Sequence, residues 1–555
     1  MPFYKFDDLR LWTGGAWKMP AGSARKTDIR GFSADSRKME KDFAFVALRG
    51  ARDGCDFARD AVENGASAVI ADRPLDLPVP VLVVGDALKA LQAVAKFHRL
   101  RFENPVVGIT GSCGKTSTKE MLARLVAWKN PLATEKNFNN EIGVPLTVTK
   151  IDLRQNQCAI IEAGVAAPGQ MGELAEIISP DIAVITNVGL SHLEKFGEIA
   201  NVAREKALLA AAAANGGWCL MHSNLLSWKS FEELKCKKAI VANADAPDIK
   251  ADLVFRYALS ERGESVGVEM CVEGGAEYFF EIGRMTQGMT ENAMLAIAAA
   301  LMLGAREEQI AAAAETLAPL PMRGLCANAG GSLYYADCYN ASPTSMKDAL
   351  AHFLKISGGA PRLFLLGSMA ELGLAAHRHH KEIGLNLPYR EGDRAVLVGE
   401  NAETYKLGML ESAWPEDAIG VFADSDSARE SVAAFKGSVF AKGSRVCALE
   451  NALPAAALAA LDDDDFVRRS RDVNDAGRKQ FVEAFERLGL EYFSDGANFV
   501  MVKAEDAPQK FVEMQKRGVI VRPNVGYGLP DWLRITIGKP EQNERCIGEL
   551  AKLAK

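Results

Sequence analysis

The sequence lacks any long hydrophobic run. No stretch of its 555 residues approaches the roughly 18–20 consecutive apolar residues of a membrane-spanning helix, and the most apolar stretch, 207–214, is short and rich in alanine. The first eight residues carry charges where a secretory signal has an apolar core. We therefore expect neither a membrane span nor a secretory signal, and we predict a cytoplasmic protein.

The sequence also lacks paired cysteines and an excess of positive charge. Its ten cysteines are scattered singly, with no Cys-x-x-Cys pair, which predicts free thiols in a reducing compartment and argues against disulfides or structural zinc. The formal net charge of −7 gives no indication of a nucleic-acid-binding surface. What is present is ordinary globular composition over a length that suggests three or four domains of about 150 residues each.

One glycine-rich stretch organises the chain. Apolar residues at 105–110 predict a buried strand, and residues 116–128 predict a helix with one apolar face. Between them, glycines allow backbone N–H groups to close around phosphates, and a lysine and the helix N-terminus add positive charge. The predicted phosphate-binding residues are Thr110, Gly111, Ser112, Cys113, Gly114, Lys115, Thr116 and Ser117.

The spacing of this stretch departs from the general nucleotide-binding pattern. Ile109 occupies a position where that pattern requires glycine, so a glycine-rich turn without a ligand is the alternative. The order of strand, Gly-Lys-Thr and helix favours a phosphate loop, in which the Thr116 hydroxyl can bind Mg²⁺.

Two further side chains follow strands that we place beside this loop. Glu162 follows a strand at 159–161, and His192 comes soon after a strand at 181–187. The carboxyl ends of strands form the ligand-binding edge of an open α/β sheet. A carboxylate and a neutral imidazole are suitable ligands for a divalent ion that bridges phosphates, so we predict a metal site here.

Other polar residues allow two interpretations. Asn137, Asn139 and Asn140 cannot share one face of a helix or strand, so they indicate a loop that contacts a polar ligand or an ordinary Asn-rich turn.

Lys206 lies in a helical stretch and, from the sequence alone, is interpreted as a surface lysine. The histidines at 377, 379 and 380 favour a solvated helical face over a metal site.

We expect four segments along the chain. Residues 1–100 form a small α/β domain, 101–318 a central nucleotide-binding domain, and 319–452 a doubly wound, Rossmann-like domain. Within the central segment, residues 216–285 give only two strand-like runs, 254–257 and 278–282. Residues 453–555 form a compact αββ-type unit, in which four aspartates at 462–465 favour the start of a helix at 466–488 and strands are expected at 498–502, 519–523 and 532–537.

Several motifs, in the right order, give residues 1 to about 452 a resemblance to a known family. They are 35–37 (Asp-Ser-Arg) with 45–50 (Phe-Val-Ala-Leu-Arg-Gly), 110–116 (Thr-Gly-Ser-Cys-Gly-Lys-Thr), 137–145 (Asn-Phe-Asn-Asn-Glu-Ile-Gly-Val-Pro), 191–197 (Ser-His-Leu-Glu-Lys-Phe-Gly), 337–343 (Asp-Cys-Tyr-Asn-Ala-Ser-Pro), 366–373 (Leu-Gly-Ser-Met-Ala-Glu-Leu-Gly) and 442–445 (Lys-Gly-Ser-Arg). These residues resemble the Mur ligases of peptidoglycan synthesis, and most closely the branch that adds D-alanyl-D-alanine. The Asp-Asn-Pro-Arg string typical of the diaminopimelate-adding branch is absent.

The resemblance implies an ATP-driven amide ligase of three domains. Its expected substrates are UDP-N-acetylmuramoyl-tripeptide, D-alanyl-D-alanine and ATP with Mg²⁺, and its expected form is a cytoplasmic monomer. Two alternatives remain open, namely a Mur-type ligase with another amino acceptor and a non-catalytic scaffold that binds nucleotide and UDP-sugar.

The resemblance also implies roles for residues. Lys115, Glu162, His192 and Lys206 would be catalytic, with Lys206 carbamylated, and Thr116, Glu162, His192 and Lys206 would serve Mg²⁺. Besides the phosphate loop, the ATP contacts would be Asn292, Arg323 and Asp337. The substrate contacts would be Asp35, Ser36, Arg37, Asn137, Asn140, Tyr339, Asn340, Lys442 and Ser444.

The chain departs from the family pattern at a few positions. They are Cys55, Glu291, Ala336, Ser342 and Ser368, which stand where the family often has His, His, an acidic residue, Asn and Asp. None of them removes a phosphate-binding or metal-binding group, so we expect catalysis to persist. The departures bear on acceptor specificity and on the adenine pocket.

The last hundred residues resemble the C-terminal small domain of histidinol-phosphate aminotransferases. The matching strings lie at 455–463, 497–500, 517–523, 526–530 and 533–538, and they include Arg522 and Arg534, which in that family bind substrate phosphate and carboxylate. The large domain and its pyridoxal-phosphate lysine have no counterpart in the sequence, so we expect no pyridoxal phosphate. A vestigial fusion, an interaction or dimerisation module and an anion-binding appendage remain open.

Overall fold

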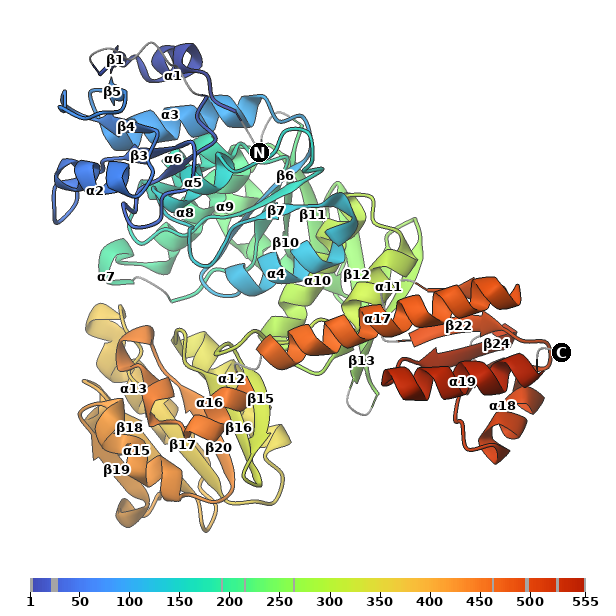
Figure 1. The fold of residues 1–555 in the computed structure, drawn as a ribbon. Helices are drawn as coiled ribbons and strands as arrows, with labels where there is room; N and C mark the ends of the chain where they lie inside the picture. The colour runs from blue at the N-terminus through green and yellow to red at the C-terminus, as the bar shows by residue number, and fades with distance from the viewer. Residues whose placement is uncertain are drawn as a thin grey trace. The chain divides into compact units, whose positions relative to one another are not determined.

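The computed structural model describes residues 3–20, 28–190, 193–213, 216–262, 265–461, 464–494, 499–525 and 529–553. The chain divides into two compact units, Met1–Ala457 and Leu458–Lys555, and each is described by itself. Among the described residues, three β-sheets belong to the first unit and one to the second (Figure 1).

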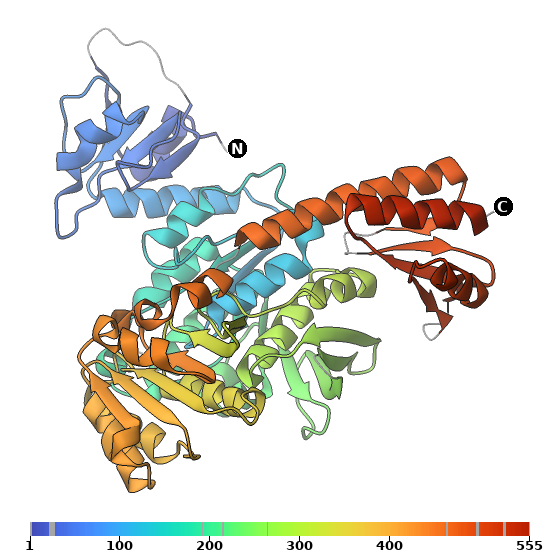
Figure 2. The same cartoon turned by 60° about the horizontal axis from the view of Figure 1, so that its bottom comes forward.

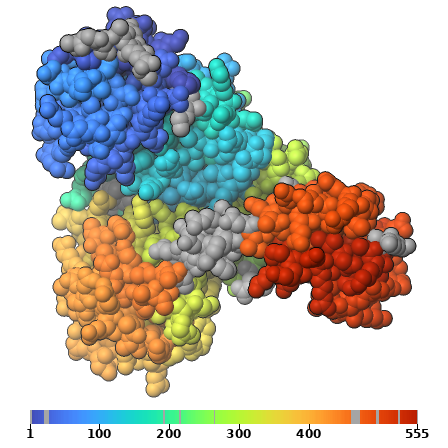
Figure 3. Space-filling view, viewed as in Figure 1, coloured from blue at the N-terminus to red at the C-terminus, as the bar shows by residue number. Residues whose placement is uncertain are grey.

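The first sheet of the larger unit has the order β1-β5-β4-β3-β2, in which only β1 runs antiparallel to its neighbour. Its strands are β1 (Ala16–Lys18), β2 (Gly31–Ser33), β3 (Phe43–Val46), β4 (Ala68–Ala71) and β5 (Val81–Val83), with helices α1 (Phe6–Thr13), α2 (Ala58–Glu63) and α3 (Ala87–Leu100). Helix α3 contacts the central segment, where the Arg99 guanidinium donates to the carbonyl of Ile178 at 2.9 Å and to Asp181 at 3.0 Å. The N-terminal and central segments touch directly in the space-filling view (Figure 3).

The central sheet has the order β14-β13-β12-β11-β10-β9-β6-β8-β7. Its strands are β6 (Val106–Thr110), β7 (Leu132–Ala133), β8 (Ala159–Glu162), β9 (Ile182–Ile185), β10 (Trp218–His222), β11 (Lys237–Asn243), β12 (Leu253–Arg262), β13 (Ser265–Val272) and β14 (Glu277–Gly283). Strands β7 to β12 are parallel, and β13 and β14 continue the sheet antiparallel.

Helices cover both faces of this sheet, and for that reason every residue of β6, β8 and β9 is buried. One apolar cluster joins the sheet to α4 (Lys115–Leu125), α10 (Gln287–Met302) and α11 (Glu307–Ala314). The other joins it to α5 (Gly143–Val148), α6 (Gln170–Ile178), α8 (Ile199–Ala211) and α9 (Lys229–Glu232), while α7 (Leu193–Phe196) precedes α8. The strand and helix expected on either side of the glycine-rich stretch are confirmed.

Residues 216–285 contain more strands than the two that were expected, because β10 to β14 all lie there. The missed strand β10 reads Trp-Cys-Leu-Met-His, a short apolar run with no β-branched residue, which local sequence cannot distinguish from a buried helix. Its pairing with β9 on one side and β11 on the other makes it a strand.

The third sheet has the order β15-β16-β20-β17-β18-β19 and is parallel except for β15. Its strands are β15 (Leu325–Ala329), β16 (Ser332–Asp337), β17 (Arg362–Gly367), β18 (Arg394–Val398), β19 (Ile419–Phe422) and β20 (Ser438–Lys442). They alternate with α12 (Pro343–Ile356), α13 (Ala376–Leu385), α14 (Ala402–Glu411) and α15 (Ser425–Ala434). The doubly wound pattern expected here is confirmed.

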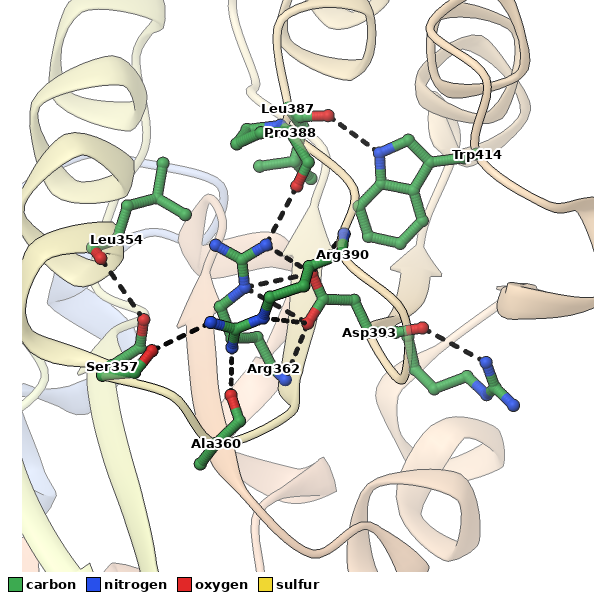
Figure 4. A network of polar contacts seen from close by, with 11 residues as sticks. Leu354, Ser357, Ala360, Arg362, Leu387, Pro388, Arg390, Asp393 and Trp414 are labelled. Carbon is green, nitrogen blue, oxygen red and sulfur yellow. Dashed lines mark hydrogen bonds and ion pairs between the residues drawn. The ribbon is translucent and has the colours of Figure 1, made fainter.

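A buried ion pair fixes the amino edge of this third sheet (Figure 4). The Asp393 carboxylate is fully buried and accepts hydrogen bonds from the backbone N–H and the guanidinium of Arg362 and from the backbone N–H of Arg390, each at about 3.0 Å. The same guanidinium donates to the carbonyl of Pro388 at 3.1 Å. The pair therefore ties the start of β17 to the turn that precedes β18.

In its described residues, the second unit is a four-stranded antiparallel sheet, in the order β21-β22-β24-β23, with three helices. Its elements are α17 (Asp464–Leu488), β21 (Tyr492–Phe493), β22 (Phe499–Lys503), α18 (Ala507–Lys516), β23 (Arg522–Asn524), β24 (Leu529–Thr536) and α19 (Pro540–Leu553); α16 (Ala455–Leu461) precedes them across the boundary. Helices α17 and α19 lie side by side (Figures 1 and 2).

Three strands were expected in this second unit, and the short strand β21 and the helices α18 and α19 were missed. The strand expected from residue 519 begins only at Arg522, and the helix expected at 466–488 begins two residues earlier, at Asp464. Asp462 and Asp463 lie outside the described residues. In the part of the chain that the structure describes, no helix combines the length and apolar character that crossing a membrane requires.

Candidate active site at the phosphate loop

The glycine-rich loop leaves the carboxyl end of β6, and α4 begins at Lys115 directly after it. In the sheet register, Ile109 is paired with Glu162 of β8, and Thr110 is paired with Ile185 of β9. The ends of two neighbouring strands therefore flank the loop, one on each side.

Two glycines are required by close approaches to other residues. A Cβ atom at Gly111 would lie 1.8 Å from the Thr186 hydroxyl oxygen. Gly114 has a φ of 80°, and a Cβ atom there would lie 2.4 Å from the Asn292 amide nitrogen. The structure thus brings Asn292, which lies on α10, beside the loop.

Residues that directly follow β9 hold the loop in shape. The Thr186 hydroxyl donates to the carbonyl of Cys113 at 2.5 Å, and the Cys113 N–H donates to the Asn187 side-chain oxygen at 2.9 Å. The Ser112 N–H donates to the Asn187 carbonyl at 3.1 Å. The sequence reasoning missed both Thr186 and Asn187, although a Thr-Asn pair at the end of a buried strand beside the loop was the available signal.

Lys115 and Thr116 lie at the start of α4, and both of their side chains donate hydrogen bonds. The Lys115 ammonium donates to the carbonyl of Gly111 at 2.7 Å, and the Thr116 hydroxyl donates to Glu162 Oε1 at 3.1 Å. Thr116 and Glu162, which the sequence assigned to one metal site, are therefore in direct contact.

Glu162 is buried, with 1% of its surface exposed. Its Oε1 also accepts a hydrogen bond from the Asn139 side-chain amide at 2.8 Å, whereas its buried Oε2 has no partner among the described residues. A buried carboxylate oxygen without a partner is costly, and a cation would satisfy it. The hydroxyl and carboxylate oxygens of Thr116 and Glu162 suit Mg²⁺.

Asn139 belongs to the loop for which two interpretations were open and was given no role of its own, and His192 lies outside the described residues. The convergence of Glu162 and His192 therefore stays a prediction. Within the described ranges no group of three or more His, Cys, Asp or Glu side chains gathers as a metal-binding cluster.

The interpretation of Lys206 as a surface lysine is wrong. Its side chain lies on the inner side of α8 with 4% of the residue exposed. Burial, reinforced by the positive charge of Lys115, lowers the pKa of Lys206 from 10.5 to about 7. The neighbouring Glu205 is also buried and accepts from the backbone N–H groups of Gly169 and Met171 at the start of α6.

The expectation of a solvated histidine face on α13 is also wrong. His379 and His380 are buried, and only His377 is exposed. Burial in the third domain's core, against Tyr405, overrides the polar character of these side chains. The three residues do not form a metal site.

The predicted residues of the third sheet gather at the carboxyl ends of β16 and β20. Asp337 and Lys442 are register partners and form an ion pair, and the Lys442 ammonium also donates to the carbonyl of Asn340 at 3.1 Å. The Arg323 guanidinium lies 3.8 Å from the ring centre of Tyr339. Lys442 and Ser444, which the resemblance assigned as substrate contacts, are buried.

Several departures from the family pattern have a local explanation. Ser342 is the N-cap of α12, a position that serine and asparagine fill equally well, and its hydroxyl lies 3.3 Å from the thiol of Cys113. The buried Ser368 hydroxyl accepts from the backbone N–H of Asn401 at 2.9 Å. Glu291 uses its carbonyl to contact His222.

The predicted UDP-contacting residues lie in the turn that follows β2 of the N-terminal domain. The Asp35 carboxylate receives two hydrogen bonds from the Arg37 guanidinium, at 2.9 and 3.0 Å, and this pairing lowers the pKa of Asp35 to about 2. The carbonyl of Ser36 accepts from Asn64 at 3.1 Å. In the central domain, residues 137–142 form a loop as expected, and the Asn140 side-chain oxygen accepts from the Gly143 N–H at the start of α5.

Comparison with known proteins identifies the class. Residues 28–99, 109–300 and 324–445 match the families described as Mur ligase family catalytic domain, Mur ligase middle domain, and Mur ligase glutamate ligase domain. The chain belongs to the Mur ligase family. Residues 437–550 match aminotransferase class I and II, which confirms the resemblance of the C-terminal segment.

Two curated relatives are D-alanyl-D-alanine-adding ligases. The UDP-N-acetylmuramoyl-tripeptide–D-alanyl-D-alanine ligase of Bacillus subtilis is 33% identical, over 69% of this chain and 83% of the relative, and that of Escherichia coli is 29% identical, over 76% and 92%. A crystal structure of MurF from Acinetobacter baumannii matches with a TM-score of 0.70 at 25% identity, covering 81% of this chain and 98% of that one. MurF from Thermotoga maritima in complex with ADP matches with a TM-score of 0.65 at 25% identity, covering 78% and 98%. The three-domain α/β architecture with an appended α+β unit is thereby confirmed.

Proposed function

We propose that this protein is the ligase that joins D-alanyl-D-alanine to UDP-N-acetylmuramoyl-tripeptide, with cleavage of ATP to ADP and phosphate, in peptidoglycan synthesis. The observation that carries the proposal is the hydrogen bond from Thr116 to the buried Glu162 beside the phosphate loop, in a chain whose relatives carry that name. The tripeptide carboxylate would attack the γ-phosphorus of ATP, release ADP and form an acyl phosphate. The dipeptide amine would then attack the acyl carbon, releasing phosphate and a proton.

The phosphate loop supplies the charge that the first step requires. A carboxylate and the ATP phosphates repel each other, and the Lys115 ammonium at the start of α4 would offset that repulsion as charge develops on the transferring group. The nucleotide would also displace Lys115 from the Gly111 carbonyl that it contacts in this structure. Asn292 would contact adenine, and Arg323 and Asp337 would contact ATP from the third domain.

Thr116 and Glu162 would hold Mg²⁺, together with His192 and a carbamylated Lys206. Among the described residues Glu162 Oε2 has no hydrogen-bond partner, which supports this assignment for the Thr116–Glu162 pair. Bound Mg²⁺ would neutralise phosphate charge. The lowered pKa of Lys206 supports its carbamylation, because only the neutral amine reacts with carbon dioxide.

Each of the three domains would bind a different substrate or part of a substrate. The N-terminal domain, residues 1–100, would hold the UDP moiety through Asp35, Ser36 and Arg37. The central domain, 101–318, would hold ATP and, through Asn137 and Asn140, the muramoyl-peptide. The third domain, 319–452, would receive the dipeptide near Tyr339, Asn340, Lys442 and Ser444, and residues 453–555 would be a separate appendage. We propose a cytoplasmic monomer.

The test is phosphate release by purified protein with ATP, Mg²⁺ and UDP-N-acetylmuramoyl-tripeptide, with and without D-alanyl-D-alanine. We expect release that requires both substrates and a product whose mass equals their sum less water. Release that requires a different amine would reassign the acceptor, and no release with any amine, despite ATP binding, would refute the ligase assignment.

A further inference from the structure

The first turn of α10, in the central domain, is capped in part by a side chain of the third domain. Within the helix, the Thr286 hydroxyl at the N-cap accepts from the Met289 N–H at 3.2 Å. The N–H of Gly288 donates instead to the carboxylate of Asp348, at 3.3 Å to Oδ1 and 3.2 Å to Oδ2. Asp348 lies on α12, so this hydrogen bond joins the two domains.

The contact depends on a glycine on α10. A Cβ atom at Gly288 would lie 2.9 Å from Asp348 Oδ2, so a larger residue there would displace the carboxylate. The N-terminus of a helix carries partial positive charge, and a carboxylate that accepts from it forms a charge-assisted hydrogen bond. Asp348 is therefore placed where its negative charge stabilises the docking of α12 on α10.

Two further contacts connect the third domain with the same region. The hydroxyl of Ser342, at the start of α12, lies 3.3 Å from the thiol of Cys113 in the phosphate loop. A Cβ atom at Gly324, which directly precedes β15, would lie 3.7 Å from the Met289 sulfur. The third domain thus contacts both the phosphate loop and the first turn of α10.

Helix α10 connects the Asp348 contact to the candidate active site. Asn292, one helical turn after Gly288, lies against Gly114 of the phosphate loop. Asp348 belongs to the domain whose residues are assigned to the dipeptide. The place where Asp348 docks therefore sets how that domain faces the phosphate loop.

We propose that Asp348 is a positioning residue for the ligation reaction, because its carboxylate docks the third domain on the first turn of α10. The proposal rests on the function proposed above, in which a dipeptide held by the third domain attacks an acyl phosphate formed in the central domain. Without the contact, the docked arrangement would be less populated. A ligand that requires this arrangement would then bind more weakly by the same factor.

The first experiment compares steady-state kinetics of full-length wild-type, Asp348→Ala and Asp348→Asn protein. We expect Asp348→Ala to raise KM for D-alanyl-D-alanine by about tenfold, as for a lost charge-assisted hydrogen bond, with KM for the tripeptide unchanged. Asp348→Asn keeps an oxygen that can accept from the Gly288 N–H and should hold the dipeptide KM within about threefold of wild type. A protein that is merely destabilised would show a lower kcat at an unchanged dipeptide KM.

Glu430 supplies the matched control for these variants. It is an exposed carboxylate on α15 of the same domain, and Glu430→Ala should match wild type in every kinetic constant.

The second experiment disturbs the same contact from the side of α10. Alanine favours a helix more than glycine does, so an effect of Gly288→Ala reports the displaced carboxylate and not a weakened helix. We expect Gly288→Ala to raise the dipeptide KM by about tenfold. The double variant Gly288→Ala/Asp348→Ala should show no further rise, because one contact can be lost only once.

Three results would overturn this inference alone. They are an unchanged dipeptide KM in Asp348→Ala, an equal rise in Glu430→Ala, and a double variant whose rise is the product of the two single rises. Absence of dipeptide-dependent turnover in wild type would overturn the proposed function as well.

Discussion

The buried Lys206 gives a prediction that can be worked through in numbers. With a pKa of about 7, about half of the Lys206 side chains are neutral at pH 7, against roughly one in 3,000 for a lysine of ordinary pKa. Burial therefore raises the fraction of Lys206 in the neutral, reactive form by about a thousandfold. Carbon dioxide should convert this amine to a carbamate while most other lysines stay unmodified.

The pH dependence has a definite sign. The pKa is lowered, so protonation returns as the pH falls through 7, and the neutral fraction decreases from about nine tenths at pH 8 to about one tenth at pH 6. Carbamylation and ligase activity should decrease together over this interval, and added bicarbonate should restore part of the activity near pH 6.5.

The assay is ¹³C NMR of the protein in ¹³C-bicarbonate, with Lys206→Met beside wild type. We expect one carbamate signal in wild type at pH 8, a much weaker one at pH 6, and none from this site in Lys206→Met. Lys195, in α7 of the same domain, supplies the control variant Lys195→Met, which should keep the signal. A signal that persists in Lys206→Met, or no signal in wild type at pH 8, would refute the reasoning.

Four further outcomes are expected. Glu162→Gln should raise the Mg²⁺ concentration needed for half-maximal phosphate release by about 10–100-fold, while Glu120→Gln, an ion-paired carboxylate on α4, should not. Gly114→Ala should weaken ATP binding in calorimetry, because φ is 80° and the new Cβ atom would lie 2.4 Å from Asn292. Asp393→Asn should lower the stability of the third domain by about 3–5 kcal/mol, seen as faster hydrogen exchange in β17, because it leaves a buried guanidinium without its carboxylate. Truncation after residue 453 should leave ligase activity within about twofold, and loss of activity in a folded truncated protein would show that residues 454–555 take part.

The sequence predicted those elements whose local pattern agrees with their final environment. Strands β6, β8 and β9 are buried on both faces and read as continuous apolar runs, and the glycines at 111 and 114 mark the loop between β6 and α4. It failed for β10, which has no β-branched residue, and for Lys206 and His380, whose polar side chains are buried by helices packed from elsewhere in the chain. Thr186, Asn187 and Asn139 act through contacts between distant segments, and no spacing rule reports such contacts.

The sequence by itself determined the order of the domains, the phosphate loop and the resemblance to the Mur ligases, because each of these depends on short motifs of neighbouring residues. Only the tertiary structure decided which groups are charged, buried or held. The same lysine is an ordinary surface cation when a helix is considered alone, and it becomes an amine with a pKa of about 7 when α8 packs its inner side against the sheet and places it near the charge of Lys115. Likewise Glu162 is one carboxylate among many until parallel pairing with β6 places it beside Thr116 with one oxygen left for a cation. The physical reason is that desolvation and charge–charge interaction depend on distance in space, which the linear sequence does not contain.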